Sequence, residues 1–136
     1  MKIRWVKLIL GAIAAEAGAI VALVCVVAVF GPKQINEAQR YAEKMGQWVG
    51  PIAGAIFSFI GALWIGSSLT RGHLLHGLLF GLFIAAVDVS LLVAMRAPFE
   101  WLFVISDIGK IAAGIIGGLV ASRCSGNNLA RDRSTH

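Results

Sequence analysis

The sequence has little charge for its length, and this scarcity argues against a soluble fold. Charged residues make up 14% of the 136 residues, against about a quarter in soluble domains. Apolar residues make up 58%, and a chain this short has too small an interior to bury so much hydrocarbon. We therefore expect a lipid bilayer to be its main surroundings. The length predicts a single domain.

The usual signatures of catalysis and metal binding are also scarce. The two cysteines, Cys25 and Cys124, stand alone, with no metal-binding or redox spacing. The serines lack a histidine–acid partnership, and the GIIGG glycines continue a helical pattern that no strand precedes. His73 and His76 are spaced like two metal ligands, but without a third ligand nearby an interfacial role is favoured. We predict no enzymatic activity, no catalytic residue, no cofactor and no metal.

Four apolar windows are long enough to cross a bilayer, namely residues 8–30, 48–69, 74–95 and 101–122. As helices they would each be about 33 Å long, which matches a hydrocarbon core of about 30 Å. None shows the alternation of a membrane strand. A basic start followed by an apolar run also fits a signal peptide, but the first window is too long and contains Glu16. The prediction is an all-α integral membrane four-helix bundle with antiparallel neighbouring spans.

The basic residues predict how the bundle is oriented. Seven Lys and Arg lie on the side of the two termini and four lie on the other side, so both termini should be cytoplasmic and the membrane a bacterial inner membrane. The net charge of +5 fits contact with anionic lipid headgroups, and we predict no nucleic-acid partner.

The connections between the spans differ in kind. Residues 31–46 form the only long connection, for which a short surface helix and a solvated linker are equally compatible with the sequence. Pro51 falls in the first turn of its window, which indicates a helix start. Residues 1–123 form one four-span domain, and the polar residues 124–136 are predicted to be a disordered cytoplasmic tail.

Every span carries a stripe of small residues. Membrane helices pack closely through such stripes, because apolarity alone gives them little reason to associate. Four stripes in one short chain predict a tight bundle or a homo-oligomer. The glycines expected to make the helix contacts are Gly54, Gly61, Gly77, Gly81, Gly114 and Gly118.

Four ionisable residues lie inside the spans: Glu16, Asp88, Asp107 and Lys110. Such residues rarely face lipid and are candidates for function. Asp88 and Asp107 fall at nearly the same depth on adjacent helices, with Lys110 one turn away, which predicts a buried Asp–Lys–Asp cluster. Glu16 has no neutralising residue on its own span, so we expect it to be protonated near neutral pH.

Two stretches resemble known families. Residues 61–82, GALWIGSSLTRGHLLHGLLFGL, together with residues 112–123, AAGIIGGLVASR, resemble a family of uncharacterised small four-span bacterial membrane proteins. Residues 11–16, GAIAAE, are similar to the opening of small multidrug resistance transporters. That second resemblance implies a dimer in which Glu16 binds protons and cationic substrates in turn.

Two functional hypotheses follow from these features. The first is a non-enzymatic inner-membrane protein that self-associates or packs against a larger membrane partner, with the buried charges fixing how its helices meet. The alternative is a small proton-coupled transporter or ion pathway that uses Glu16 as its proton or cation site.

Overall fold

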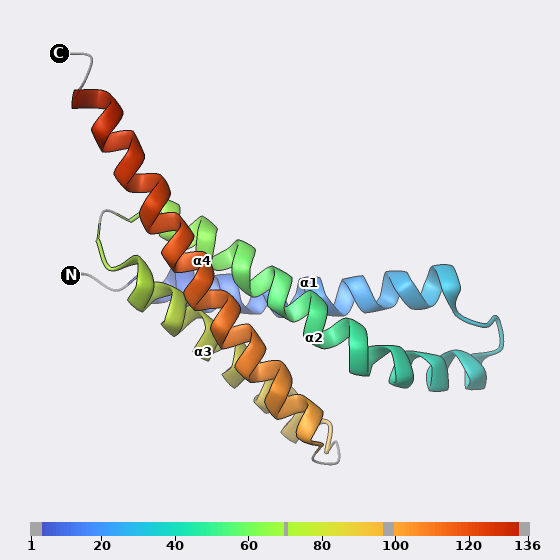
Figure 1. Ribbon diagram of the computed structural model, residues 1–136. Coiled ribbons are helices and arrows are strands. Elements are labelled where there is room, and N and C mark those ends of the chain that lie inside the picture. Colours follow the sequence, from blue (N-terminus) through green and yellow to red (C-terminus); the bar gives the residue numbers. More distant parts are fainter. Residues whose placement is uncertain (1–3, 70, 97–99, 134–136) are drawn as a thin grey trace.

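The computed structural model describes residues 4–69, 71–96 and 100–133 of the chain. They form four helices: α1 (Trp5–Phe30), α2 (Ile35–Ser67), α3 (His73–Ala94) and α4 (Trp101–Arg133). No strand occurs within these ranges. The predicted all-α four-helix bundle is confirmed (Figure 1).

All four helices are long and apolar enough to cross a membrane. Their outer faces carry large apolar side chains, as lipid-facing surfaces require. On α2 these side chains recur every fourth residue and are each more than half exposed: Trp48, Ile52, Ile56, Ile60 and Trp64. The tryptophans lie at the two ends of this stripe, where interfacial anchors are expected. The chain is therefore a multi-pass membrane protein by the length and composition of its helices.

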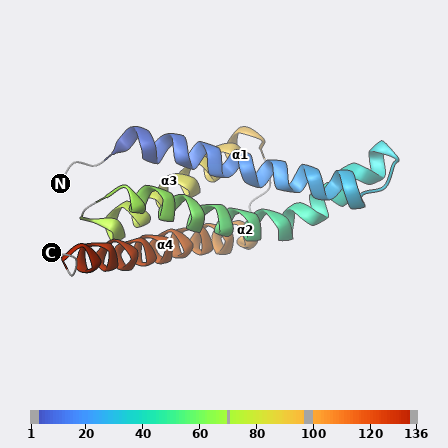
Figure 2. The same cartoon turned by 90° about the horizontal axis from the view of Figure 1, so that it is seen from above.

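The helices form two antiparallel hairpins, α1–α2 and α3–α4, which cross at an angle (Figures 1 and 2). The start of α1 and the end of α4 lie at one end of the bundle, with the end of α2 and the start of α3, and we call this the terminal end. The opposite end holds the α1–α2 and α3–α4 connections. Helix α2 packs against the other three, whereas α1 and α4 make no backbone contact in the part of the chain that is described.

An apolar core fills the half of the bundle nearer the terminal end. Its centre is Phe80 on α3, which is fully buried among Leu8, Ile65 and Ile84. Gly61 on α2 lies against the phenyl ring, where a Cβ atom would be only 2.5 Å from Cε1. The missing side chain is therefore what allows the ring to enter between the helices.

Glycines bring the backbones of α3 and α4 into direct contact. A Cβ atom on Gly114 would lie 2.6 Å from the carbonyl oxygen of Gly77, and one on Gly118 would lie 2.6 Å from that of His73. Gly81 approaches the backbone of α4 in the same way, with a Cβ 2.7 Å from the Cα atom of Ile111. These small-residue stripes are occupied by contacts within one chain.

The connection between α1 and α2 is shorter than the segment 31–46, for which the sequence was compatible with a surface helix or a solvated linker. Only residues 31–34 connect the helices, and residues 35–46 continue directly into the second span. Pro51 consequently lies in the interior of α2, so its prediction as a helix start is wrong. Residues 35–45 are mostly good helix formers. Gly50 has no Cβ to collide with the proline ring, which lets the helix pass through Pro51.

The end of the chain also differs from its prediction. Helix α4 continues to Arg133, whereas the sequence was expected to become disordered from residue 124. No proline follows Trp101 to stop the helix. The last part of the expected tail, residues 134–136, lies outside the described residues.

Candidate functional site

The four ionisable residues of the spans meet in one place, around the ammonium group of Lys110. Its Nζ atom lies 2.5 Å from Oδ2 of Asp88 on α3 and 3.0 Å from Oε1 of Glu16 on α1. Asp107, one turn before Lys110 on α4, has its Oδ1 atom 3.9 Å away. We call these four residues the charge network. Lys110 thus connects three helices through its side chain.

Lys110 reaches this position by crossing the face of α2. Gly54 of α2 lies directly under the lysine side chain, where a Cβ atom would be 3.4 Å from Cδ and Nζ and closer still to Cε. One turn further along α2, the Ser58 hydroxyl donates a hydrogen bond of 2.7 Å to the backbone carbonyl of Lys110. Helix α2 therefore holds the lysine at both its backbone and its side chain.

The charge network is buried, and its formal charges do not cancel. The side chains of Lys110 and Glu16 are 3% and 8% exposed, and Asp88 and Asp107 are also largely covered. Three carboxylates face one ammonium group, which leaves a formal charge of −2 if all are ionised. The Oδ1 atom of Asp107 is buried without a hydrogen-bond partner. A buried excess of negative charge is costly, so the network favours binding of protons or cations.

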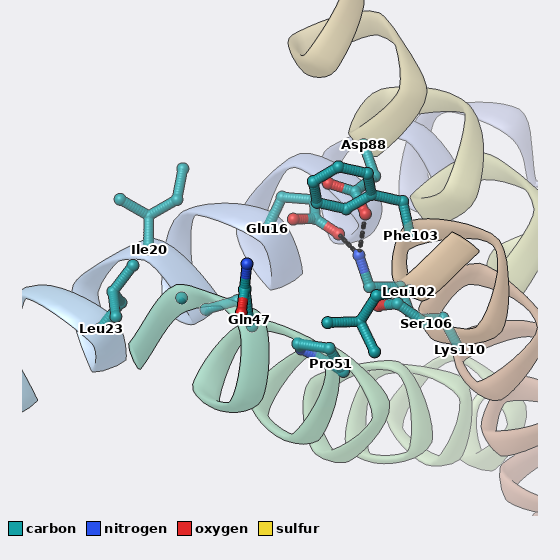
Figure 3. Close-up of a pocket in the computed structure, with 13 residues that line it drawn as sticks. Glu16, Ile20, Leu23, Gln47, Pro51, Asp88, Leu102, Phe103, Ser106 and Lys110 are labelled. Atoms are coloured by element: carbon teal, nitrogen blue, oxygen red, sulfur yellow. Dashed lines mark hydrogen bonds and ion pairs between the residues drawn. The ribbon is translucent and has the colours of Figure 1, made fainter. Parts of the chain in front are cut away.

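A pocket of about 150 Å³ lies beside the charge network and extends toward the opposite end of the bundle. Glu16, Asp88 and Lys110 contribute its polar wall (Figure 3). The rest is mainly apolar, including Leu23 of α1 and Phe103 of α4. With about 30 Å³ per molecule in liquid water, this volume suits a few waters or a small ion. It is below the roughly 300–1,000 Å³ of pockets that bind drug-sized ligands.

Helix α2 lines the pocket where its backbone hydrogen bonding is interrupted. Pro51 has no N–H, so it cannot donate to the carbonyl of Gln47, four residues earlier. Both residues line the pocket. The Gln47 side chain also donates a 3.5 Å hydrogen bond to Glu100, the residue that precedes α4. The wall formed by α2 thus combines a weakened helix with a contact between the two hairpins.

The terminal side of the charge network is closed by the apolar core. Phe80 and Ile84 precede Asp88 on the same face of α3 at spacings of four residues, and both are completely buried. With Leu8 and Ile65 they form an apolar layer, which we call the Phe80 layer. The Phe80 layer accordingly lies between the charge network and the terminal end, while the pocket extends toward the opposite end.

The structure adds one contact to the predicted charges. Glu16 was expected to be protonated, because no residue of the first span could neutralise it. The compensating group comes from the fourth helix instead, since Lys110 is long enough to cross α2. Gln47 and the contact of Ser58 with Lys110 were not anticipated.

The two histidines, for which an interfacial role was favoured, lie buried between helices in the first turn of α3. His73 is 8% and His76 is 1% exposed. Their Nδ1 atoms lie 3.0 Å and 2.9 Å from the backbone carbonyl oxygens of Gly66 and Gly72. No group of three or more metal-ligating side chains occurs within the described residues.

Comparison of the chain with protein-family models, curated proteins and solved structures finds no match. The site is therefore interpreted from its own geometry.

Proposed function

We propose that this membrane protein is a small proton-coupled transporter or ion pathway, with the charge network as its proton or cation site. The observation that carries the proposal is that Glu16, Asp88 and Lys110 form the wall of a pocket instead of a dry contact between helices. A static ion pair that only fixes helix packing has no need of access from one end of the bundle. The predicted topology would place that opening on the non-cytoplasmic side.

The balance of charges defines the ligand. One ammonium group cannot neutralise three carboxylates, so up to two protons or a small cation can bind to the network with a gain in electrostatic energy. The pocket volume restricts the transported species to protons, small inorganic cations or small organic cations. The Phe80 layer supports transport in two steps, because a bound ion would have to wait for this layer to open.

Self-association was the first expectation from the sequence, and it rested on the four stripes of small residues. Gly54, Gly61 and Gly114 each contact another helix of the same chain, so these positions of the stripes on α2 and α4 do not require a second copy. We therefore place the ion-coupled function ahead of a role as an accessory bundle. Crosslinking in native membranes tests the second role, which a consistent absence of dimer or bound partner would contradict.

Proton flux into sealed liposomes tests the proposed function. Liposomes containing the purified protein and an internal pH dye are given a pH gradient in the presence of different small cations. We expect flux above that of empty liposomes, and the isosteric change Glu16→Gln should abolish it. Glu43→Gln is the matched control, because Glu43 is an exposed carboxylate on α2 that does not line the pocket. Unchanged flux in Glu16→Gln, or none in the wild type, would reject the proposal.

A further inference from the structure

The path of the Lys110 side chain depends on the absence of a side chain at one position of α2. Helices α1 and α4 make no backbone contact in the described part of the chain, yet Nζ of Lys110 lies 3.0 Å from Glu16. Helix α2 packs against both α1 and α4, and the lysine side chain lies across its face on the way to the carboxylates. Gly54 is the residue under that crossing, since an added Cβ would overlap the Cε atom of Lys110.

We propose that Gly54 is a positioning residue that directs Lys110 onto Glu16 and Asp88. A methyl group at position 54 would fill the space through which the lysine chain passes. The flexible end of that chain would then have to move, and the two short ion pairs at 2.5 Å and 3.0 Å depend on where it ends. Gly54 would in this way set the charge balance of the network without touching a ligand.

The backbone contact on the same helix strengthens the inference. The Ser58 hydroxyl is completely buried and donates to the carbonyl of Lys110 at 2.7 Å. This bond fixes the height of the lysine backbone relative to α2, so the side chain cannot easily slide along the helix to avoid a new methyl group. The displacement has to be taken up by the ammonium end, which is the part that contacts Glu16 and Asp88.

Stability measurements on Gly54→Ala separate an effect through Lys110 from a general packing defect. Gly109→Ala is the matched control, because it adds the same methyl group next to Lys110 where a Cβ meets no atom within 4 Å. We expect Gly54→Ala to lower the melting temperature relative to Gly109→Ala. In a Lys110→Ala background the methyl group has room, so Gly54→Ala should leave the melting temperature unchanged or raise it. If Lys110→Ala does not fold, Glu16→Gln and Asp88→Asn are added to remove the uncompensated charge.

The second measurement reads the charge network itself. An infrared titration of the carboxyl C=O band in lipid reports how many carboxyl groups are protonated at each pH. A displaced ammonium group stabilises the carboxylates less. The carboxyl groups of the Gly54→Ala variant should therefore bind protons at a pH that is higher than in the wild type by on the order of one unit. Ser58→Ala should shift the profile in the same direction by less, and Gly109→Ala should not shift it.

Several outcomes would overturn the positioning role. These are a titration of Gly54→Ala that matches the Gly109→Ala control, a loss of stability without a shift of the titration, and an equal loss of stability in the Lys110→Ala background. The positioning role matters for function only if the proposed transport is correct, but neither the stability measurement nor the titration requires transport. If Glu16→Gln leaves flux unchanged while Gly54→Ala still shifts the titration, the proposed function fails and the positioning role stands.

Discussion

Lys110 and Glu16 form an ion pair of 3.0 Å between two helices that do not pack against each other. The pair spans the gap because α2 is narrow at Gly54 and lets the lysine chain pass. Asp88 completes the contact from α3, so one side chain joins α1, α3 and α4. The ionic contact therefore joins the two hairpins.

Replacing Lys110 with Met should destabilise the bundle strongly at neutral pH. The change leaves three buried carboxylates without their cation, and removing one partner of a buried ion pair costs about 3–5 kcal/mol. In acid the carboxyl groups are protonated and need no cation, so the loss should be smaller. Thermal unfolding at both pH values measures this difference, with Lys33→Met as the control on an exposed residue. An equal loss at both pH values would contradict the electrostatic explanation.

Phe80→Ala should both weaken the core and open the terminal side of the pocket. Removing a fully buried phenyl ring costs about 3–5 kcal/mol, and the layer between the charge network and the terminal end would lose its central group. We expect a lower melting temperature and a constant leak of protons in liposomes. Phe30→Ala, on a residue that is 72% exposed, should change neither. A stable, proton-tight Phe80→Ala protein would show that the Phe80 layer does not close the pocket.

Gly114→Ala should force α3 and α4 apart. The new methyl group would lie 2.6 Å from the carbonyl oxygen of Gly77, and backbone atoms cannot move aside as a side chain can. Overpacking of this kind costs about 1–3 kcal/mol. The free energy of unfolding in detergent should fall by this amount relative to Gly109→Ala, which lies five residues earlier on the same helix in open space. Equal stabilities of the two variants would count against close backbone packing.

The topology proposed from the basic residues can be tested by cysteine labelling of intact cells. In a chain without Cys25 and Cys124, a cysteine at Lys33 should react with a membrane-impermeant maleimide. A cysteine at Arg71 should react only after the membrane is opened. Both residues are exposed and lie in connections at opposite ends of the bundle. The reverse pattern of labelling would invert the topology and place the pocket opening on the cytoplasmic side.

The membrane character and the number of helices were predictable from the sequence, because both follow from the length of apolar segments. Helix ends were less predictable. Residues 35–46 are polar and therefore lie outside a hydropathy window, yet their helix propensity joins them to the second span. Pro51 looked like a helix start for the same reason, because the window began just before it.

The candidate site was predictable in its membership and only partly in its contacts. Charged residues are rare in apolar spans, so the members of the charge network could be identified from the sequence. The pairing of Lys110 with Glu16 was not predictable, because the sequence gives the order of the helices and not the distance between the first and the fourth. The role of Gly54 was not predictable either, because the sequence does not show which glycine of a stripe lies under the Lys110 side chain.

The pairing of Glu16 with Lys110 also bears on how the protein is made. Glu16 lies on α1 and its cation lies on α4, so the carboxyl group is synthesised before the lysine. A nascent or truncated chain that stops before residue 110 carries a carboxyl group inside the membrane with no positive partner. We therefore expect α1 to reach its final position only after α4 has been inserted, because Glu16 is then paired with Lys110.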